Sequence, residues 1–271
     1  MMWWLMACTE PASESLVGSF SVLSYNIHGL PAEVTGDDTD ARIEEIAPRL
    51  NDFDIIGLQE DWMDDNSLQL QEQSVYSNFD RFDTPRSDEQ VYGAGLSFLG
   101  TYPITKTEHI YYDRCNGLFD NGADCFASKG FQYLVLDVSG SFSLHIYNTH
   151  LEAGNSDVDH DIRSEQLETI LAHLNAIEDE PVILMGDFNL SSADPKEDTL
   201  LRDFREMGGL RQTCIELACE EPYHIDQIFF RSGQDVQLQV EEWQRDRSFV
   251  DSQGVDLSDH PAIVSLFRWQ R

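Results

Sequence analysis

The chain has 271 residues, of which 17 are basic and 50 acidic, so its formal net charge at pH 7 is −33. A hydrophobic content of 41% with 11% aromatic residues excludes a disordered acidic tail, and no apolar run reaches the roughly 20 residues that span a bilayer. The sequence holds three lysines and no basic run, which disfavours nucleic acid as a partner because such binding depends on Lys and Arg.

The chain begins with apolar residues, and Leu5-Met6-Ala7-Cys8 resembles a bacterial lipobox, in which the cysteine is lipidated. Residues 9–19 are polar and have the composition of a tether. We therefore assign residues 1–19 to a residual signal with its tether and residues 20–271 to one domain. This division predicts a bacterial protein that is secreted or held at a membrane surface through lipidated Cys8. The alternative is an apolar N-terminus without such a role.

Strand-like and helix-like segments then alternate along the chain. Helices show apolar residues at helical spacing, and strands are short apolar or alternating runs. Together they predict α/β layers with no internal linker. In chain order the expected elements are strand 20–27, helix 41–50, strands 54–59, 95–99, 131–138 and 143–149, helix 161–177, strand 181–185, helix 199–207, and strands 225–230 and 262–267.

Four cysteines besides Cys8 form two close pairs, Cys115 with Cys125 and Cys214 with Cys219. Disulfides across such short loops are typical of an oxidising compartment. A zinc site is the alternative. Neither pair has CxxC spacing or a second pair nearby, so we favour disulfides.

Polar side chains lie at the ends of several expected strands. Because adjacent strands bring their ends to one rim, these side chains are expected to meet where α/β sheets commonly bind ligands. Taken singly, Asp and Asn are also favoured in turns. Together they suit a phosphodiesterase, because Asn and Glu oxygens bind Mg²⁺ and histidines handle protons near neutral pH. The set consists of Asn26, Glu60, His150, Asp187, Asn189, Asp226, Asp259 and His260.

These residues lie in motifs that, in order and spacing, resemble the endonuclease/exonuclease/phosphatase superfamily across about residues 20–271. The resemblance implies an α/β fold, a four-layer sandwich of two mixed β-sheets flanked by helices, as in deoxyribonuclease I. It also implies cleavage of phosphoester bonds with Mg²⁺, or with Mn²⁺ or Co²⁺ in its place. The motifs are Ser24-Tyr25-Asn26-Ile27, Leu58-Gln59-Glu60, Thr149-His150-Leu151, Gly186-Asp187-Phe188-Asn189, Ile225-Asp226 and Ser258-Asp259-His260-Pro261.

The resemblance further implies which residues bind the metal and the phosphate. Glu60 is the expected metal ligand, and Asp259 is expected to help hold the ion. Asn26 is expected to be a ligand or a close neighbour of the phosphate. His150 and Asn189 are expected to contact the scissile phosphate.

The remaining roles concern protons. Asp187 is expected to position or deprotonate the attacking water. His260, paired with Asp226, is expected to act as general base or to stabilise the transition state. Removal of His260 is expected to lower the rate by about 10²–10⁴-fold, as for other positioned acid–base groups.

The segment 124–131, Asp124-Cys125-Phe126-Ala127-Ser128-Lys129-Gly130-Phe131, is similar to the Ser-Lys-Gly segment of neutral and bacterial sphingomyelinases. A cysteine pair also precedes it, as in the bacterial enzymes. Lys129 is expected to contact the substrate phosphate as a point charge. The alternative is a solvated lysine before a hairpin.

Two features depart from that branch. Gln227 stands where the family commonly has Tyr, and residues 227–258 offer Trp243 and Phe249 among charges rather than an apolar hairpin that enters a membrane. An aromatic cage for choline is not assigned, although several aromatic residues are available for cation–π contacts. These are Trp62, Tyr111, Tyr112 and Phe119.

The leading hypothesis is a monomeric, Mg²⁺-dependent phosphodiesterase of the sphingomyelinase C type, acting on a phospholipid headgroup. A secreted deoxyribonuclease of the same superfamily is the second hypothesis, and the acidic surface and the Lys129 segment argue against it. A non-catalytic surface lipoprotein is the third, and the intact set of polar residues argues against that.

Overall fold

The computed structural model describes residues 15–117, 125–220 and 224–271. Its first sheet has six strands in the order β11 (Gln237–Asp246), β12 (Ala262–Gln270), β1 (Val17–Asn26), β2 (Ile55–Gln59), β4 (Leu96–Gly100) and β3 (Asn78–Phe82). The second has the order β5 (Ile104–Tyr111), β6 (Gly130–Val138), β7 (Phe142–His150), β8 (Val182–Asp187), β10 (Asp226–Arg231) and β9 (Arg211–Gln212).

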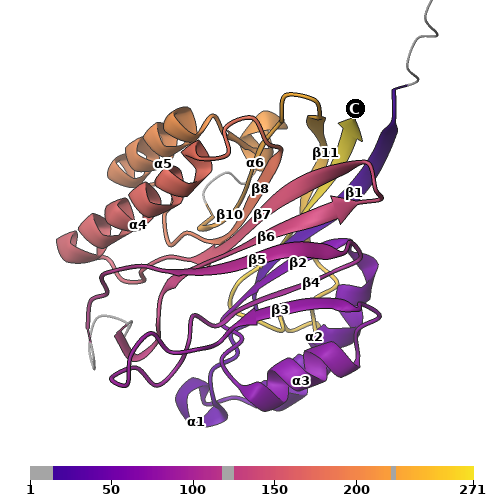
Figure 1. Ribbon diagram of the computed structural model, residues 1–271. Coiled ribbons are helices and arrows are strands. Elements are labelled where there is room, and N and C mark those ends of the chain that lie inside the picture. The colour runs from indigo at the N-terminus through magenta and orange to yellow at the C-terminus, as the bar shows by residue number, and fades with distance from the viewer. Residues whose placement is uncertain (1–14, 118–124, 221–223) are drawn as a thin grey trace, which may run out of the picture.

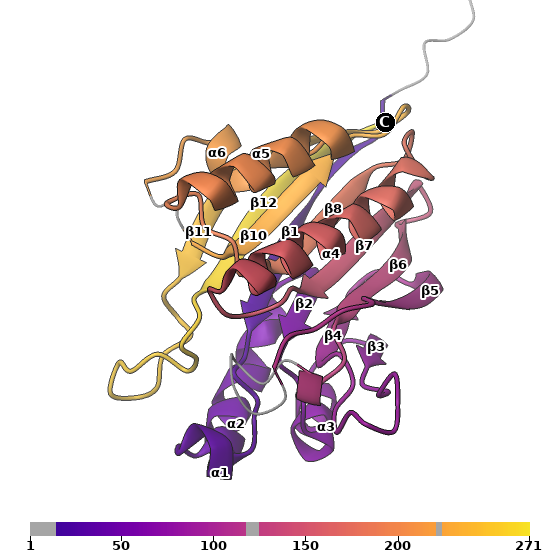
Figure 2. The same cartoon turned by 90° about the vertical axis from the view of Figure 1, so that its left-hand side faces the viewer.

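The two sheets lie face to face, and helices cover their outer faces (Figures 1 and 2). Each sheet is mixed, because β1 pairs with β2 in parallel, β7 pairs with β8 in parallel, and the other pairs are antiparallel. The predicted four-layer sandwich is therefore confirmed. The helices are α1 (Ala32–Thr35), α2 (Thr39–Arg49), α3 (Asp64–Glu72), α4 (Asp157–Asn175), α5 (Pro195–Gly208) and α6 (Thr213–Glu216), with a 3₁₀ turn at Leu50–Asp52.

Side-chain alternation along the strands builds three apolar layers. Residues such as Ile55 and Ile183 point between the sheets into a shared core. The opposite faces pack against the helices, where Ile43 of α2 covers the first sheet and Ile170 of α4 covers the second. Complete burial of one such side chain contributes about 1.5–3 kcal/mol, so these layers fix the sheets and the strand ends that they carry.

Helix boundaries follow local capping. Ser156 and Asp159 form a capping box that starts α4 at Asp157. Asp194 caps α5, and Gly209 ends that helix in the left-handed conformation. None of the helices among residues 15–117, 125–220 and 224–271 is long and apolar enough to cross a membrane.

The N-terminal division of the chain is described in part. Strand β1 begins at Val17, so residues 17–19, which were expected in the tether, belong to the sheet. Cys8 and the lipobox-like segment lie outside the described residues.

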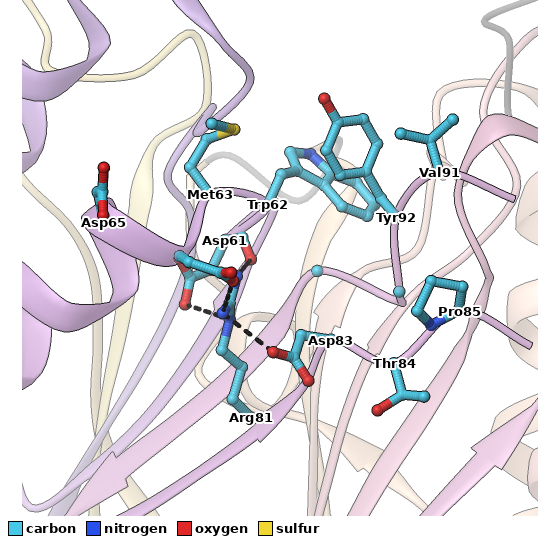
Figure 3. A pocket seen from close by; sticks show the side chains of 13 residues that line it. Asp61, Trp62, Met63, Asp65, Arg81, Asp83, Thr84, Pro85, Val91 and Tyr92 are labelled. Carbon is cyan, nitrogen blue, oxygen red and sulfur yellow. Dashed lines mark hydrogen bonds and ion pairs between the residues drawn. The ribbon is translucent and has the colours of Figure 1, made fainter.

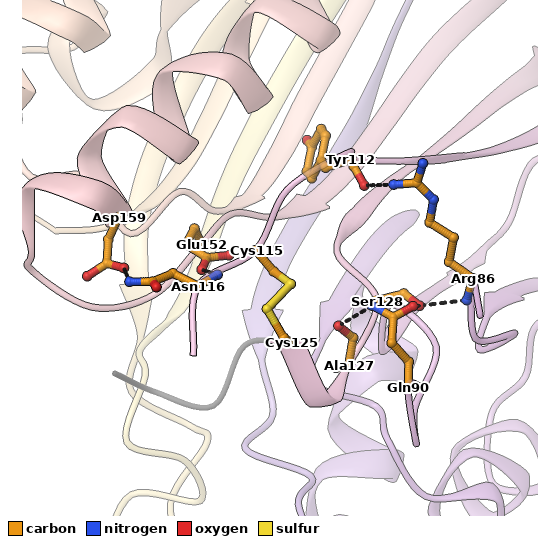
Figure 4. Close-up of a disulfide and its surroundings, with 10 residues drawn as sticks. All are labelled: Arg86, Gln90, Tyr112, Cys115, Asn116, Cys125, Ala127, Ser128, Glu152 and Asp159. Atoms are coloured by element: carbon orange, nitrogen blue, oxygen red, sulfur yellow. Dashed lines mark hydrogen bonds between the residues drawn. A yellow bond between two sulfur atoms is a disulfide. The ribbon is translucent and has the colours of Figure 1, made fainter. Parts of the chain in front are cut away.

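Both expected disulfides are present, Cys115–Cys125 and Cys214–Cys219, which confirms the pairing and removes these thiols from any zinc site. The first disulfide lies next to the segment that leads into Lys129 (Figure 4). Within that segment Ser128 Oγ accepts a hydrogen bond from the Arg86 backbone N–H and donates one to Gln90 Oε1. Ser128 thereby holds the loop of residues 86–92 against the strand that follows.

Candidate active site

The polar strand ends meet at one edge of the sandwich. Since β1 and β2 are parallel, Asn26 ends its strand beside Gln59, directly before Glu60. In the second sheet His150 pairs with Asp187, and Asp187 also pairs with Asp226 at the start of β10. Residues 258–260 immediately precede β12, the neighbour of β1, and Ser258 Oγ donates a hydrogen bond to the Asn26 carbonyl at 2.7 Å.

A cleft of about 570 Å³ opens at this edge. One part of its lining is polar, and the other is apolar and extends from the catalytic edge toward α1 and the loop of residues 91–92. The expected convergence of separate segments is therefore found. The polar lining consists of Glu60, Lys129, His150, Asp187, Asn189 and His260, and the apolar lining of Leu30, Val34, Trp62, Val91, Tyr92, Phe126, Ala127 and Ala153.

His260 lies between two buried carboxylates. Its Nδ1 is 3.1 Å from both carboxylate oxygens of Asp226, and its Nε2 is 3.6 Å from Asp187 Oδ2. Burial by itself would lower the pKa of His260, but the hydrogen bond and charge of Asp226, and then the charge of Asp187, outweigh it and raise the pKa to about 10. His260 is thus an imidazolium at neutral pH.

Asp187 is the other titrating centre. Burial and then the charge of Asp226 raise its pKa to about 6, against the charge of His260 and hydrogen bonds from the Asn189 backbone N–H at 2.9 Å and from Asn26 Nδ2 at 3.1 Å. At neutral pH Asp187 is therefore a carboxylate with proton affinity close to the working range of a general base.

A second group of donors stands beside Asp187. His150 Nε2 lies 3.5 Å from Asp187 Oδ2, and burial followed by the charges of Lys129 and His260 lowers the pKa of His150 well below its ordinary value. Lys129 Nζ and Asn189 Nδ2 each donate to the Leu151 carbonyl at 3.1 Å. One carbonyl therefore fixes a cation and an amide on the same wall of the cleft, next to a neutral histidine.

Glu60 has the properties of a metal ligand. Its Oε1 accepts a hydrogen bond from Asn26 Nδ2 at 2.9 Å, whereas its Oε2 is buried without a hydrogen-bond partner among the described residues. His28 Nδ1 lies 3.8 Å from Glu60 Oε2 and 3.3 Å from Asp259 Oδ1, so both carboxylates approach the same position. An unsatisfied carboxylate oxygen with a second carboxylate close by fits a hard divalent cation.

Asn26 has a different orientation from that of a direct ligand. Its amide nitrogen faces Glu60 and Asp187, and its Oδ1 accepts the His28 backbone N–H at 3.0 Å. In this arrangement Asn26 links the carboxylate of Glu60 to the carboxylate of Asp187.

Asp187, Asp226 and His260 also lie close enough to share a metal ion, with their ligand atoms within 4.8 Å of one another. Both ring nitrogens of His260 already face carboxylates, and Asp187 accepts two further hydrogen bonds. This cluster is therefore better satisfied by a proton than by a cation, and the unpartnered Oε2 of Glu60 is the position that better fits a cation.

Backbone conformation is unusual at the site. Among the described residues five non-glycine residues have positive φ, and three of them are His28, Glu60 and Asn189, at φ values of 50°, 60° and 49°. Left-handed backbone in such residues is uncommon and clusters at functional sites. These residues turn the chain after β1, β2 and β8, and the side chains of Glu60 and Asn189 line the cleft.

Not every aromatic residue considered for a cation contact lies in the cleft. Trp62 lines it, but Tyr112 is buried in the core with its hydroxyl on Thr149, and Tyr111 packs on Phe82. Phe119 lies outside the described residues. Sequence reasoning missed Tyr92, which lines the cleft, and His28, which lies two residues after Asn26 in the first motif.

The departures from the sphingomyelinase pattern have structural explanations. Gln227 is buried, donates to the His224 carbonyl at 2.6 Å and accepts from Gln212, so it is satisfied inside the sheet. Trp243 stacks on His224, and Phe249 is buried against Tyr25. Both aromatic rings therefore pack against the sandwich.

The sandwich and its rim of carboxylates, histidines and amides have the fold and the donor groups of a metal-dependent phosphoesterase. The model of the Endonuclease/Exonuclease/phosphatase family matches residues 23–260, and the chain belongs to this family. The family and the fold are thus as the sequence predicted.

Several curated proteins are similar to this chain in sequence. A sphingomyelinase of Mycobacterium tuberculosis is 26% identical over 279 residues, which cover 94% of this chain and 54% of that protein. The chain therefore spans about half the length of the curated relatives it matches.

Solved structures show the same fold. Sphingomyelinase C from Streptomyces griseocarneus has a TM-score of 0.70 at 21% identity, over 92% of this chain and 99% of that one. A beta toxin variant from Staphylococcus aureus with bound magnesium ions has a TM-score of 0.68 at 17% identity, over 92% of this chain and 99% of that one.

Proposed function

We propose that the chain is a Mg²⁺-dependent phosphodiesterase of the sphingomyelinase C type, which hydrolyses sphingomyelin to phosphocholine and ceramide. The observation that carries the proposal is the joint position of Glu60, Asp187 and His260 on one cleft with Lys129 in its wall. The sphingomyelinase names of the relatives support the substrate.

In this mechanism water attacks phosphorus, the bond to the ceramide oxygen breaks, and that oxygen leaves as a hydroxyl by taking up one proton, which balances the proton lost by the water. Asp187 accepts the proton of the water, and its pKa of about 6 leaves it ionised at neutral pH. The adjacent imidazolium of His260 stabilises negative charge that develops on the phosphoryl oxygens. Asp226 keeps the proton on His260 and orients the ring.

The phosphate is held by the opposite wall. His150, Lys129 and Asn189 offer N–H donors to its non-bridging oxygens, and Leu151 fixes two of them. A divalent cation at Glu60, with Asp259 beside it, would neutralise charge on the phosphate and on the leaving oxygen.

We further propose that the protein acts outside the cytoplasm as a monomer, secreted or anchored to the cell envelope through Cys8. The two disulfides support an oxidising compartment. Expression in a bacterium with a labelled fatty-acid precursor tests the anchor. We expect the wild type to carry the label and Cys8→Ser to lack it. Equal labelling of the two proteins would contradict the lipid anchor.

A substrate panel tests the activity. Wild type and His260→Ala are assayed on sphingomyelin vesicles, phosphatidylcholine vesicles, supercoiled plasmid and an inositol phosphate, each with Mg²⁺ or with excess chelator. We expect the wild type to release phosphocholine from sphingomyelin, and the chelator or His260→Ala to suppress this. Plasmid nicking without lipid hydrolysis would favour the deoxyribonuclease instead, and no turnover of any diester would favour a binding protein.

A further inference from the structure

A second hollow of about 620 Å³ lies beside the catalytic cleft, and three residues line both. They are Trp62, Val91 and Tyr92, so two aromatic rings form much of the boundary between the hollows. The Trp62 and Tyr92 ring centroids are 5.9 Å apart at an angle of 52° (Figure 3). Nothing in the proposed reaction uses this wall or the hollow behind it.

The two aromatic residues are held in place next to residues of the candidate site. The backbone N–H of Trp62 donates to the Glu60 carbonyl at 3.0 Å. The backbone carbonyl of Tyr92 accepts from the backbone N–H of Ser128, the residue before Lys129, at 3.0 Å. Gly95 lets the indole lie against its chain, because an added Cβ there would be 2.6 Å from the Trp62 ring. The backbone of Trp62 is thus bonded to Glu60, and the backbone of Tyr92 is bonded to the residue before Lys129.

The hollow behind the rings is acidic. Four aspartates line it, Asp61, Asp64, Asp65 and Asp83, against a single basic residue among its described lining residues, Arg81. Arg81 is itself bound, at 2.6 Å from Asp64 and 3.1 Å from Asp83 (Figure 3). Asp61 is buried, whereas Asp64 and Asp83 are exposed, so the solvent-facing negative charge of the hollow lies on the exposed aspartates.

We propose that the Trp62–Tyr92 wall and the acidic hollow bind a quaternary ammonium group, while the catalytic edge binds the phosphate of the same substrate. Aromatic faces attract alkylammonium ions by about 0.5–2 kcal/mol, and the aspartates add negative potential that repels a second phosphate. A nucleotide or a phosphoinositide carries further anionic groups and is disfavoured here. A choline phosphodiester places its cation one ethylene unit from the phosphate and matches this division of charge. This assignment rests on the proposed phosphodiesterase function.

The test compares a choline diester with its uncharged carbon isostere. The rates are kcat/KM for p-nitrophenyl phosphocholine and for p-nitrophenyl 3,3-dimethylbutyl phosphate, which has the same shape without the positive charge. We expect the wild type to prefer the choline ester, Trp62→Leu and Tyr92→Leu to reduce that preference by about 3–30-fold, and Trp62→Phe to keep most of it. Asp65→Asn is expected to reduce the preference, whereas Asp235→Asn, at the far end of the sandwich, is not.

An unchanged preference in both leucine variants, with unchanged thermal unfolding, would overturn the assignment. A second measurement separates it from the proposed activity. Phosphocholine and 3,3-dimethylbutyl phosphate are titrated calorimetrically into His260→Ala and into His260→Ala with Trp62→Leu, with Mg²⁺ present. Tighter binding of phosphocholine that is lost with Trp62 supports the subsite even if no diester is hydrolysed, and equal binding of the two ligands refutes it.

Discussion

Asp226 holds the proton of His260: both of its carboxylate oxygens lie 3.1 Å from Nδ1 of that ring. Asp187 faces the other ring nitrogen at 3.6 Å. Two buried carboxylates thus compete for one histidine, and the proton stays on the ring because this places a positive charge between two negative ones. The charges of both aspartates raise the pKa of His260, whereas burial and then the charge of Asp226 raise the pKa of Asp187 against the opposing charge of His260.

Asp226→Asn therefore should lower the pKa of His260 from about 10 toward its ordinary value and reduce kcat/KM by about 10²–10⁴-fold. The side-chain shape is kept, so the effect reports the lost charge. NMR titration of the His260 ring without added metal measures the first quantity, and hydrolysis of bis(p-nitrophenyl) phosphate measures the second. Asp235→Asn, an exposed change far from the cleft, serves as control. A His260 titration that does not move would contradict the assigned proton position.

The catalytic edge was accessible from sequence because its residues follow strongly apolar strands. Asn26, His150 and Asp187 each end a buried strand, and Glu60 directly follows one. The pairing of these strands then brings the four side chains to one edge. Lys129 was found through its motif. What the residues do to one another, such as the approach of Asp187 to His260 across 73 positions, depends on tertiary packing and has no local signal.

Several elements were missed for a physical reason. Strand β5 lies at a sheet edge and has mostly exposed or half-exposed side chains, and β11 carries polar residues on its outer face. Helix α3 is short and polar, with few buried residues. Such segments lack the apolar periodicity that sequence reasoning reads. Tyr92 was missed similarly, since it lies in an irregular loop that Ser128 holds in place.

Glu60→Gln should raise the Mg²⁺ concentration required for half-maximal activity by at least about tenfold, because the amide keeps the shape but loses the charge that binds the cation. Removal of metal with a chelator should abolish activity in the wild type, and added Mg²⁺ should restore it. Metal titrations of activity and calorimetric Mg²⁺ binding measure this. Glu33→Gln in α1 is the matched control. Equal Mg²⁺ requirements in both variants would place the cation elsewhere.

Gly186 allows β7 and β8 to approach each other directly before Asp187. A Cβ at this position would lie 1.9 Å from the Thr149 carbonyl oxygen, and φ is +147°. Gly186→Ala should therefore destabilise the fold by about 2–4 kcal/mol and displace Asp187. Gly140→Ala is the control, because its φ is also positive, at +67°, but its surroundings are open. The unfolding temperature should fall clearly further for Gly186→Ala than for Gly140→Ala. Similar decreases would show that backbone strain alone, and not the contact with Thr149, determines the loss of stability.

His145 predicts how stability changes in acid. Burial, and then the charges of Lys106 and Arg231, lower its pKa to about 4, although Glu180 lies 3.6 Å away at the surface. In the unfolded chain the ring takes a proton near its ordinary pKa of about 6.5, so between these values the unfolded state binds more protons and stability falls as pH falls.

Between pH 6.5 and 4 the free energy of unfolding of the wild type should therefore fall by about 1–2 kcal/mol more than that of His145→Asn. This is less than the full pKa shift would give, because the ring is close to solvent. Asparagine retains a polar atom near Tyr133, whose hydroxyl lies 2.7 Å from His145 Nδ1. Urea unfolding of both proteins across this range gives the difference. Parallel pH profiles would mean that the folded ring titrates normally.

The net charge of −33 predicts which membranes the proposed enzyme can use. Anionic lipid repels such a surface, and the repulsion is screened over about 10 Å at 0.1 M salt and about 3 Å at 1 M. Sphingomyelin in zwitterionic vesicles should therefore be hydrolysed several-fold faster than the same amount in vesicles with added phosphatidylserine, and high salt should remove most of the difference. A water-soluble choline diester should show no comparable salt effect. Faster hydrolysis on the anionic vesicles would require a cationic contact surface that this composition does not favour.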